Sequence, residues 1–379
     1  MPTIDVIAFF AFVAAIAALV WRDRRNVKVA GIVLMRRTQR GKGWLYRTAA
    51  RAPRAWNVLA TLGVITAVPA MVLIAHFLLG NALQVAAGAP AGEVKLALPW
   101  SEFEDRPIVL LVPWYFWVIG IAAVIVPHEL FHGIACRVAG IKIKSLGWML
   151  LIFLPGAFVE PDKRQLERAS RIAKLRVYAA GSFANFVVAA LCLLAMIALL
   201  EGLYDQRGII PASVVPGSPA YVANISGVLL SIDGIPINSE KDLVAALRDT
   251  PIGGSIAIHT TAGNYTVTTV KHPELNQSYL GVKGPYVASY ALKPGVEASG
   301  FGLAADFMKE LFGWLYAISF GIGLFNLLPI KPLDGGLIFE EMVSKFLRKR
   351  RARLVTTWLS LVMTAILVFN IIGPALIAR

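Results

Sequence analysis

The sequence predicts a mainly α, polytopic membrane protein: a helix bundle of about six spans with a re-entrant hairpin element and one inserted α+β domain. Composition indicates the class, because 57% of the 379 residues are hydrophobic and only 16% are charged. Soluble proteins carry about 25% charged residues. The apolar segments then indicate the spans, and one interruption rich in β-branched residues indicates the inserted domain.

Six apolar segments are long enough, or nearly so, to cross a hydrocarbon core about 30 Å thick. They cover residues 4–21, 57–80, 110–136, 177–200, 308–329 and 355–376. A further apolar segment at 146–159 is too short to span, and Pro155 and Gly156 interrupt any helix there. We therefore expect a re-entrant hairpin, whose irregular backbone must be satisfied by protein or by a water-filled cavity.

Basic residues gather in alternate loops. Segments 22–56, 137–176 and 345–353 hold 11, 9 and 6 of the 37 Lys and Arg residues, whereas 81–109 and 201–306 hold 2 and 6. The positive-inside rule places the basic loops in the cytoplasm and the loop 201–306 outside. The net charge of +14 is then a consequence of topology and of contact with the lipid bilayer, and it does not indicate nucleic-acid binding.

Residues 203–284 differ from the rest in composition. Short β-branched runs alternate with turn signals, and Ser239 is the predicted N-cap of a helix over 239–248. About 80 residues suffice for a small independent domain. Together with the Pro-Gly-Ser-Pro-Ala loop at 216–220, this pattern resembles a PDZ domain, which implies capture of a peptide ligand by strand addition. A steric plug without a ligand is the alternative.

The most informative motif is HExxH, formed by His128, Glu129 and His132 inside an apolar segment. Positions i and i+4 share one face of a helix, so both imidazoles can point at one metal ion, with the Glu129 carboxylate beside it to take a proton from water. Ionisable groups are costly in lipid, which favours a functional role here. A hydrolytic zinc site needs a third protein ligand and one open position.

Asp334 is the best candidate for the third ligand. It follows the fifth predicted span at the depth expected for His132, after two prolines that interrupt the helix. Gly335 and Gly336 come next and allow the backbone to bend closely around an ion. A turn at the end of the span is the alternative interpretation.

Other candidate ligands are less favourable. The remaining histidines, His76, His259 and His272, lie near the opposite end of a span or in the inserted domain. Glu160 and Asp162 border a basic segment, so we interpret them as members of solvated ion pairs.

These motifs together resemble those of the site-2 protease family of intramembrane zinc metalloproteases. The resemblance rests on the segments 128–133 and 326–335 and on Gly181-Ser182-Phe183-Ala184-Asn185 between them, and it covers about residues 115 to 340. It implies that His128, His132 and Asp334 bind one Zn²⁺ and that Glu129 is the catalytic acid/base. The family often has Pro at the position of Ser182.

Two amides accompany these motifs. Asn185 and Asn326 lie in or at the ends of predicted spans, where an amide needs partners. One interpretation is that they donate to the substrate backbone or to the oxyanion formed during attack. The other is that they join neighbouring helices.

The sequence thus predicts an enzyme that hydrolyses peptide bonds in or near the span of a single-span membrane protein. The resemblance implies that the outer domain filters substrates by size. Compactness favours a prokaryotic cell membrane, with the active site toward the cytoplasm and the PDZ-like domain outside. The alternatives are a zinc-binding membrane transporter and an inactive scaffold that presents the PDZ-like domain. The expected regions are 1–109 (first spans and basic loop), 110–202 (first part of the catalytic core), 203–284 (PDZ-like domain) and 285–379 (second part of the core).

Overall fold

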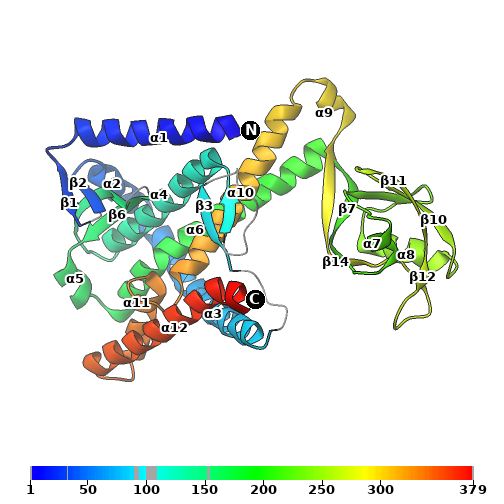
Figure 1. Cartoon of the computed structure of the whole chain (residues 1–379). Helices are drawn as coiled ribbons and strands as arrows, with labels where there is room; N and C mark the ends of the chain where they lie inside the picture. Colours follow the sequence, from blue (N-terminus) through cyan, green and yellow to red (C-terminus); the bar gives the residue numbers. More distant parts are fainter. Residues whose placement is uncertain (1, 32, 89–93, 100–108, 152–153, 378–379) are drawn as a thin grey trace. The chain divides into compact units, whose positions relative to one another are not determined.

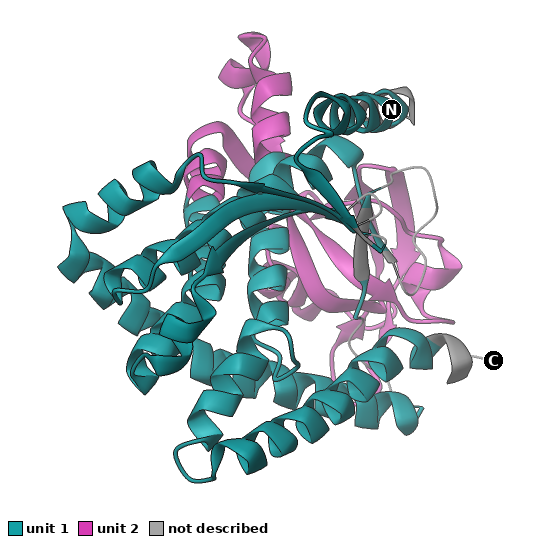
Figure 2. Cartoon of the chain, turned by 90° about the vertical axis from the view of Figure 1, so that its left-hand side faces the viewer, with its two compact units in different colours: residues 1–194, 311–379 teal, residues 195–310 magenta. Residues whose placement is uncertain are grey.

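The computed structural model of the chain describes residues 2–31, 33–88, 94–99, 109–151 and 154–377 (Figure 1). The chain divides into two compact units, shown in different colours in Figure 2. Unit 1 comprises Met1–Leu194 and Leu311–Arg379, and unit 2 is Ala195–Glu310. Each unit has its own hydrophobic core.

Long helices dominate unit 1. Four helices are long and apolar enough to cross a membrane, namely those of Pro53–Ala86, Trp114–Val138, Arg171–Leu203 and Lys349–Pro374. They belong to α3, α4, α6 and α12. The full set of helices with residues in unit 1 is α1 (Pro2–Arg22), α2 (Lys42–Arg51), α3 (Pro53–Ala86), α4 (Trp114–Val138), α5 (Lys163–Arg168), α6 (Arg171–Leu203), α10 (Gly302–Asn326), α11 (Asp334–Val343) and α12 (Lys349–Ile377).

The predicted spans at 4–21 and 308–329 fall on α1 and α10. Neither helix is among those that, in the described part of the chain, are both long and apolar enough to cross a membrane. A bundle of six spans therefore stays a prediction, whereas four candidate spans are present.

A four-stranded antiparallel sheet occupies the region where we expected a re-entrant hairpin. Its order is β1-β2-β5-β6, so β6 is an edge strand. Leu146 of β5 lies opposite Val159 of β6, and residues 152–153 of the expected element lie outside the described residues. The strands of this sheet are β1 (Val27–Ala30), β2 (Val33–Thr38), β5 (Ile143–Leu151) and β6 (Leu154–Pro161), and a separate parallel pair is formed by β3 (Leu96–Pro99) and β4 (Val109–Val112).

The pairing partner of this hairpin was not expected from the sequence. Segment 22–56 was interpreted only as a basic loop, but it supplies β1, β2 and α2. Pairing with β2 satisfies the backbone N–H and C=O groups on the second edge of β5. In an isolated apolar hairpin these groups would have no partner. Gly147 is required at this junction, because a Cβ there would lie 2.4 Å from the carbonyl oxygen of Arg36.

Unit 2 contains a mixed α+β core. Its larger sheet has the order β11-β10-β8-β7-β14, with β9 paired to β8, and Ile232, Leu243 and Ile258 are buried against it. The strands and helices are β7 (Tyr204–Val214), α7 (Pro219–Val222), β8 (Leu229–Ile232), β9 (Ile235–Pro236), α8 (Glu240–Asp249), β10 (Ser255–Thr260), β11 (Gly263–Thr268), β12 (Val270–Lys271), β13 (Ser278–Tyr279), β14 (Val282–Leu292) and α9 (Pro294–Ala298).

The predicted helix at 239–248 is confirmed as α8, and the Ser239 side chain accepts a hydrogen bond from the Asp242 backbone N–H as its N-cap. Unit 2 is longer than the expected 203–284 because β14 continues past residue 284 and pairs along β7, as far as Leu292 opposite Tyr204. The likeness to a PDZ domain stays a prediction.

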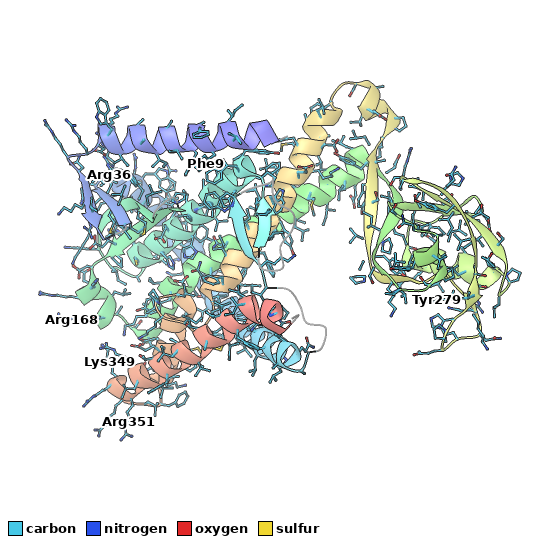
Figure 3. All side chains as sticks on the ribbon, viewed as in Figure 1. Phe9, Arg36, Arg168, Tyr279, Lys349 and Arg351 are labelled. Atoms are coloured by element: carbon cyan, nitrogen blue, oxygen red, sulfur yellow. The ribbon has the colours of Figure 1, made fainter. Side chains whose placement is uncertain are left out.

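Charged residues at the ends of helices are solvated or paired. Arg168 at the end of α5 and Lys349 and Arg351 at the start of α12 extend outward from unit 1 (Figure 3). On α11, Glu341 lies 3.7 Å from the Arg171 guanidinium and 3.4 Å from the Lys174 ammonium, both at the start of α6. These ion pairs connect the two helices whose loops and turns build the site described below.

Two buried amides join α3 and α12. Asn81 Nδ2 donates to Asn370 Oδ1 over 2.6 Å, and Asn370 Nδ2 donates to the carbonyl oxygens of Leu78 and Ile366. Their exposed fractions are 4% and 1%, so neither amide can exchange its partner for water. Polar contacts of this kind stabilise pairs of membrane helices by about 0.6–2 kcal/mol.

We expect Asn81→Leu and Asn370→Leu each to lower the free energy of unfolding by about 1–2 kcal/mol, because each leaves the other amide without its partner. The double variant should lose less than the sum of the two. Unfolding of the purified chain in mixed detergent micelles with increasing dodecyl sulfate measures all three values. Strictly additive losses would show that the two amides do not interact.

Candidate metal centre

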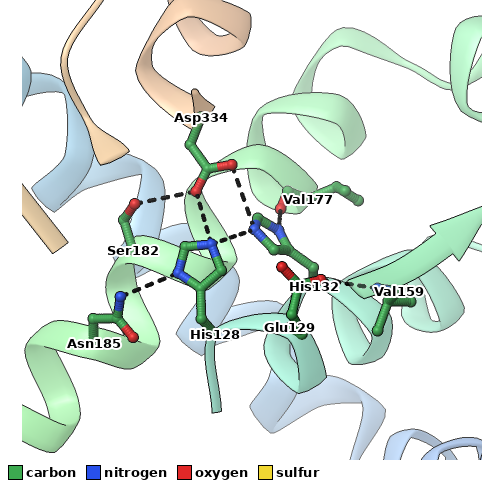
Figure 4. Close-up of polar contacts among 8 residues, drawn as sticks. All are labelled: His128, Glu129, His132, Val159, Val177, Ser182, Asn185 and Asp334. Carbon is green, nitrogen blue, oxygen red and sulfur yellow. Dashed lines mark hydrogen bonds and ion pairs between the residues drawn. The ribbon is translucent and has the colours of Figure 1, made fainter. Parts of the chain in front are cut away.

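The two histidines of the HExxH motif lie side by side on α4. Their rings are 4.7 Å apart, and the Nε2 atoms of His128 and His132 are separated by 3.1 Å (Figure 4). The i, i+4 spacing on a regular helix produces this arrangement without distortion of the backbone. Both imidazoles therefore present one nitrogen to the same small region.

Asp334 completes the group from α11. Its Oδ2 atom lies 3.5 Å from Nε2 of His128, and its Oδ1 atom lies 3.4 Å from Nε2 of His132. The two glycines that follow allow this position. A Cβ on Gly335 would lie 2.1 Å from the carbonyl oxygen of Leu327, so only glycine lets α11 begin directly against the preceding loop. Both glycines lie closely against the preceding loop, and their bend around an ion stays a prediction.

Gly181 on α6 forms the third side of the group. A Cβ at this position would lie 2.3 Å from Nε2 of His132 and 2.6 Å from Nε2 of His128. Any side chain would therefore occupy the space toward which both ring nitrogens point. The absence of a side chain at residue 181 keeps a small cradle between α6, the two imidazoles and the Asp334 carboxylate.

Hydrogen bonds on the far side of each ring orient the histidines. Nδ1 of His132 lies 2.6 Å from the carbonyl oxygen of Val177 and can only donate to it, which leaves Nε2 with a free lone pair. Asn185 Nδ2 lies 3.1 Å from Nδ1 of His128, while its Oδ1 atom is buried without a partner among the described residues. Rotating the amide by half a turn lets Oδ1 accept from Nδ1–H of His128 and presents its Nε2 lone pair in the same way.

Two further contacts hold the acidic side chains. The hydroxyl of Ser182, which is fully buried, donates to Asp334 Oδ2 over 3.1 Å. Glu129 Oε2 accepts a hydrogen bond of 2.9 Å from the backbone N–H of Val159 on β6, and Figure 4 shows the carboxylate beside His132. Sequence reasoning treated Ser182 only as a departure from a family pattern. A hydroxyl inside an apolar helical segment was the signal that could have identified it.

Asn326 was also predicted as a site residue. It is the last residue of α10, and in the described part of the chain its side chain makes no hydrogen bond to the two histidines or to Asp334. Its predicted contact with substrate stays a prediction. Asn185 contacts His128 and is placed to orient its ring, and the predicted contact of Asn185 with substrate or oxyanion stays a prediction.

The alternative ligands lie elsewhere. Glu160 pairs with Arg37 of β2 over 3.1 Å and accepts from the Ser145 hydroxyl over 2.7 Å. Asp162 is the N-cap of α5, and the hydrogen bond from the Gln165 backbone N–H holds the pKa of its carboxyl below the usual range. The histidines at 76, 259 and 272 are outside the group formed by His128, His132 and Asp334.

The geometry suits a tetrahedral metal ion. Ligand atoms of His128, His132 and Asp334 all lie within 4.8 Å of one another. A tetrahedral ion with bonds of about 2.1 Å places neighbouring donor atoms roughly 3.4 Å apart, close to the separations between the imidazole nitrogens and the carboxylate oxygens. Two imidazoles and one carboxylate are a donor set that zinc accepts, with one position left for water.

The sequence profile of peptidase family M50 matches residues 116–370, a stretch that contains the whole group. The chain belongs to peptidase family M50. This is the site-2 protease family that the motifs resembled. Membership in M50, together with the four apolar helices, makes the chain a multi-pass membrane protein of a metalloprotease family.

Similar proteins match different lengths of the chain. An uncharacterised protein of Methanocaldococcus jannaschii is 27% identical over 94% of this chain and 90% of its own length. A protein of Clostridium perfringens, provisionally named a zinc metalloprotease, is 26% identical over 62% of this chain and 88% of its own length. An Arabidopsis thaliana homologue of the membrane-bound transcription factor site-2 protease is 29% identical over 44% of this chain and 35% of its own length.

We expect Gly181→Ala to weaken zinc binding by at least about tenfold, because changes that only disturb the orientation of ligands already cost 10–100-fold. The matched control is Gly202→Ala on the same helix, where a Cβ would meet nothing within 4 Å. Metal analysis of the two purified variants after dialysis against a graded chelator gives the comparison. Equal zinc retention in both would mean that the cradle beside Gly181 is not the metal site.

Proposed function

We propose that this chain is an intramembrane zinc metalloprotease that hydrolyses peptide bonds in or near the transmembrane segments of membrane proteins. One observation carries the proposal. His128 and His132 of α4 and Asp334 of α11 converge on one largely buried cradle, and Glu129, the acidic residue of the HExxH motif, lies beside them. The three residues would hold one zinc ion.

The proposed reaction needs only a few groups of this chain. When bound, zinc acts as a Lewis acid that acidifies water and polarises a carbonyl group. Glu129 takes a proton from the attacking water, whose oxygen bonds to the carbonyl carbon of the scissile peptide. As the carbon–nitrogen bond breaks, Glu129 returns this proton to the leaving amine. The products are a carboxylate and a new amino terminus.

The surroundings of Glu129 support its role. The hydrogen bond from Val159 holds one of its carboxylate oxygens, and no side chain or backbone group that the structure describes donates a hydrogen bond to the other, which can exchange a proton within the cradle. His132 is fixed by Val177 and His128 by Asn185, so neither ring has to rotate during turnover. Preorganised polar groups of this kind avoid the cost of reorganisation during the reaction.

A helical substrate must unwind before it is cut, because its carbonyl groups are bonded within the helix. We propose that the unwound segment adds to the open edge of β6 as a further strand. In an antiparallel ladder, alternate residues direct their backbone groups to opposite edges. Since the N–H of Val159 points to Glu129 and away from β5, the N–H of Ala157 faces the same open edge. This edge leads directly to the Glu129 carboxylate.

We also propose a route from the bilayer. An apolar cavity of about 510 Å³ lies between α3, α6 and α10 and is lined by Phe186 and Phe320. Phe186 directly follows Asn185, the partner of His128. Apolar substrate side chains can be accommodated in such a cavity close to the metal centre.

The role of unit 2 and the sidedness belong to the same proposal. The strand β14 is an edge strand of the unit 2 sheet, which suits peptide capture by strand addition; exclusion of large ectodomains is the alternative role. We place unit 2 outside and the metal centre toward the cytoplasm, because the basic loops flank the helix ends of unit 1. The long matches in an archaeon and a bacterium support a prokaryotic cell membrane.

The decisive test is Glu129→Gln in the purified chain. The amide oxygen can still accept from Val159, so we expect the fold and the zinc content to be retained while cleavage of a single-span membrane protein falls at least about 100-fold. His132→Ala should lose both zinc and cleavage. Cleavage is followed by gel electrophoresis and zinc by elemental analysis.

The matched control is Glu167→Gln, which makes the same change on the exposed face of α5 and should cleave normally. Unchanged cleavage by Glu129→Gln would refute the mechanism. A wild-type chain that binds zinc but cuts no membrane span would favour a zinc-binding transporter or an inactive scaffold.

We expect Ala157→Pro to lower the cleavage rate about 3- to 10-fold, the equivalent of one lost hydrogen bond of about 0.5–1.5 kcal/mol. Proline is tolerated at an open strand edge, so β5 and β6 should stay paired. Ala157→Ser keeps the N–H and should cleave like the wild type. If proline and serine variants cleave equally well, the substrate does not pair with β6.

A further inference from the structure

A polar cavity lies between the ends of three helices of unit 1, and His128, His132 and Asp334 are not among its lining residues. Its volume is about 260 Å³, which is below the roughly 300–1,000 Å³ of pockets that hold drug-sized ligands. Its lining includes Trp56 and Asn57 of α3, Ala135 and Val138 of α4, and Ala173 and Arg176 of α6. The cavity is therefore sized for a small group.

Arg176 is the only charged side chain that lines this cavity in the part of the chain that the structure describes. Its Nε donates to the Thr61 hydroxyl over 3.0 Å, and its Nη1 donates to Asn57 Oδ1 over 3.3 Å. Both partners are neutral, and no described carboxylate lies within 4.0 Å of the guanidinium. A guanidinium has five N–H donors, so three of them are left for another acceptor.

The neighbouring basic residues on the same helix differ from Arg176. Arg171 and Lys174 both pair with Glu341 of α11. A cation that is half-buried in a membrane bundle without an anion is unfavourable, since charges removed from water need paired partners. The structure around Arg176 thus provides the cation, the space and the orienting neutral groups for an anion.

The position of the cavity indicates which anion. Asn57 lies in the second turn of α3, Arg176 in the second turn of α6, and Val138 is the last residue of α4. These are ends of three candidate spans, where lipid headgroups lie. Planar guanidinium groups bind phosphate oxygens through two parallel hydrogen bonds. Trp56, with its indole N–H bonded to the Thr48 carbonyl, supplies the aromatic wall found at membrane interfaces.

We propose that this cavity binds a phosphate group, supplied by an anionic phospholipid headgroup or by free phosphate, through the open donors of Arg176. The occupant fills the charge-pairing role that Glu341 has for the other two cations. Binding also stabilises the contacts of α6 with α3, because Arg176 connects the two helices. The site is independent of the proposed protease activity.

The test uses the full-length chain, stripped of lipid in a neutral detergent, and follows its thermal unfolding midpoint. Three probes are titrated separately: inorganic phosphate, phosphatidylglycerol and phosphatidylcholine. We expect phosphatidylglycerol, phosphate or both to raise the midpoint of the wild type. Arg176→Gln should need at least about tenfold more of the same probe, as expected for the loss of a charge-assisted hydrogen-bond pair.

Two further variants make the test specific. Arg54→Gln removes a charge from an exposed residue of α3 near the same end and should respond like the wild type. Ala173→Met fills the cavity while Arg176 stays in place and should abolish the response, so the test does not depend on the folding of one variant.

The outcomes separate the two sources of phosphate. A response to phosphatidylglycerol alone identifies a lipid site, and a response to inorganic phosphate identifies a free-anion site. The proposal is overturned if neither probe raises the wild-type midpoint, if phosphatidylcholine acts as strongly as phosphatidylglycerol, or if Arg176→Gln and Arg54→Gln respond alike.

Discussion

The metal centre depends on one constraint: polar groups inside an apolar bundle must satisfy one another, because lipid offers them no partner. His128 and His132 face Asp334 on one side and find Asn185 and Val177 on the other. A hydrogen bond holds each imidazole ring at Nδ1, and its Nε2 atom faces the space beside Asp334. The open directions of the two rings coincide at the cradle beside Gly181, so the contacts that satisfy these polar groups also assemble the candidate metal site.

These side chains can converge because the backbones that carry them approach closely. Gly181 lets α6 lie against both imidazoles, and Gly335 lets α11 begin against the loop that precedes it. A buried hydrophobic cluster keeps the helices at this separation; it includes Leu45 of α2, Ile134 of α4 and Val177 of α6. Core packing therefore acts on the metal centre directly, since Val177 is both a packing residue and, through its carbonyl, the partner of His132.

The hairpin connects the fold to the proposed chemistry. The N–H of Val159 is an edge group of β6 and at the same time the partner of Glu129, so the strand edge and the carboxylate proposed as the proton acceptor are in direct contact. The hairpin in turn depends on β2, which comes from a basic segment more than a hundred residues earlier. The strand β2 is thus distant from the HExxH motif in the sequence but supports the position of Glu129.

The sequence by itself determined the membrane class, the HExxH pair, the acidic third member at Asp334 and the glycines that allow its turn, because helix periodicity, hydropathy and residue chemistry are local properties. It also identified the Ser239 helix cap, and it singled out Asn185 without predicting the contact of this amide with His128. Only the tertiary structure decided that Ser182 holds Asp334, that backbone groups of Val177 and Val159 hold His132 and Glu129, and that β2 pairs with β5. Every residue has the same backbone carbonyl and every residue except proline the same N–H, so the side-chain type does not indicate which main-chain group makes a contact across the fold.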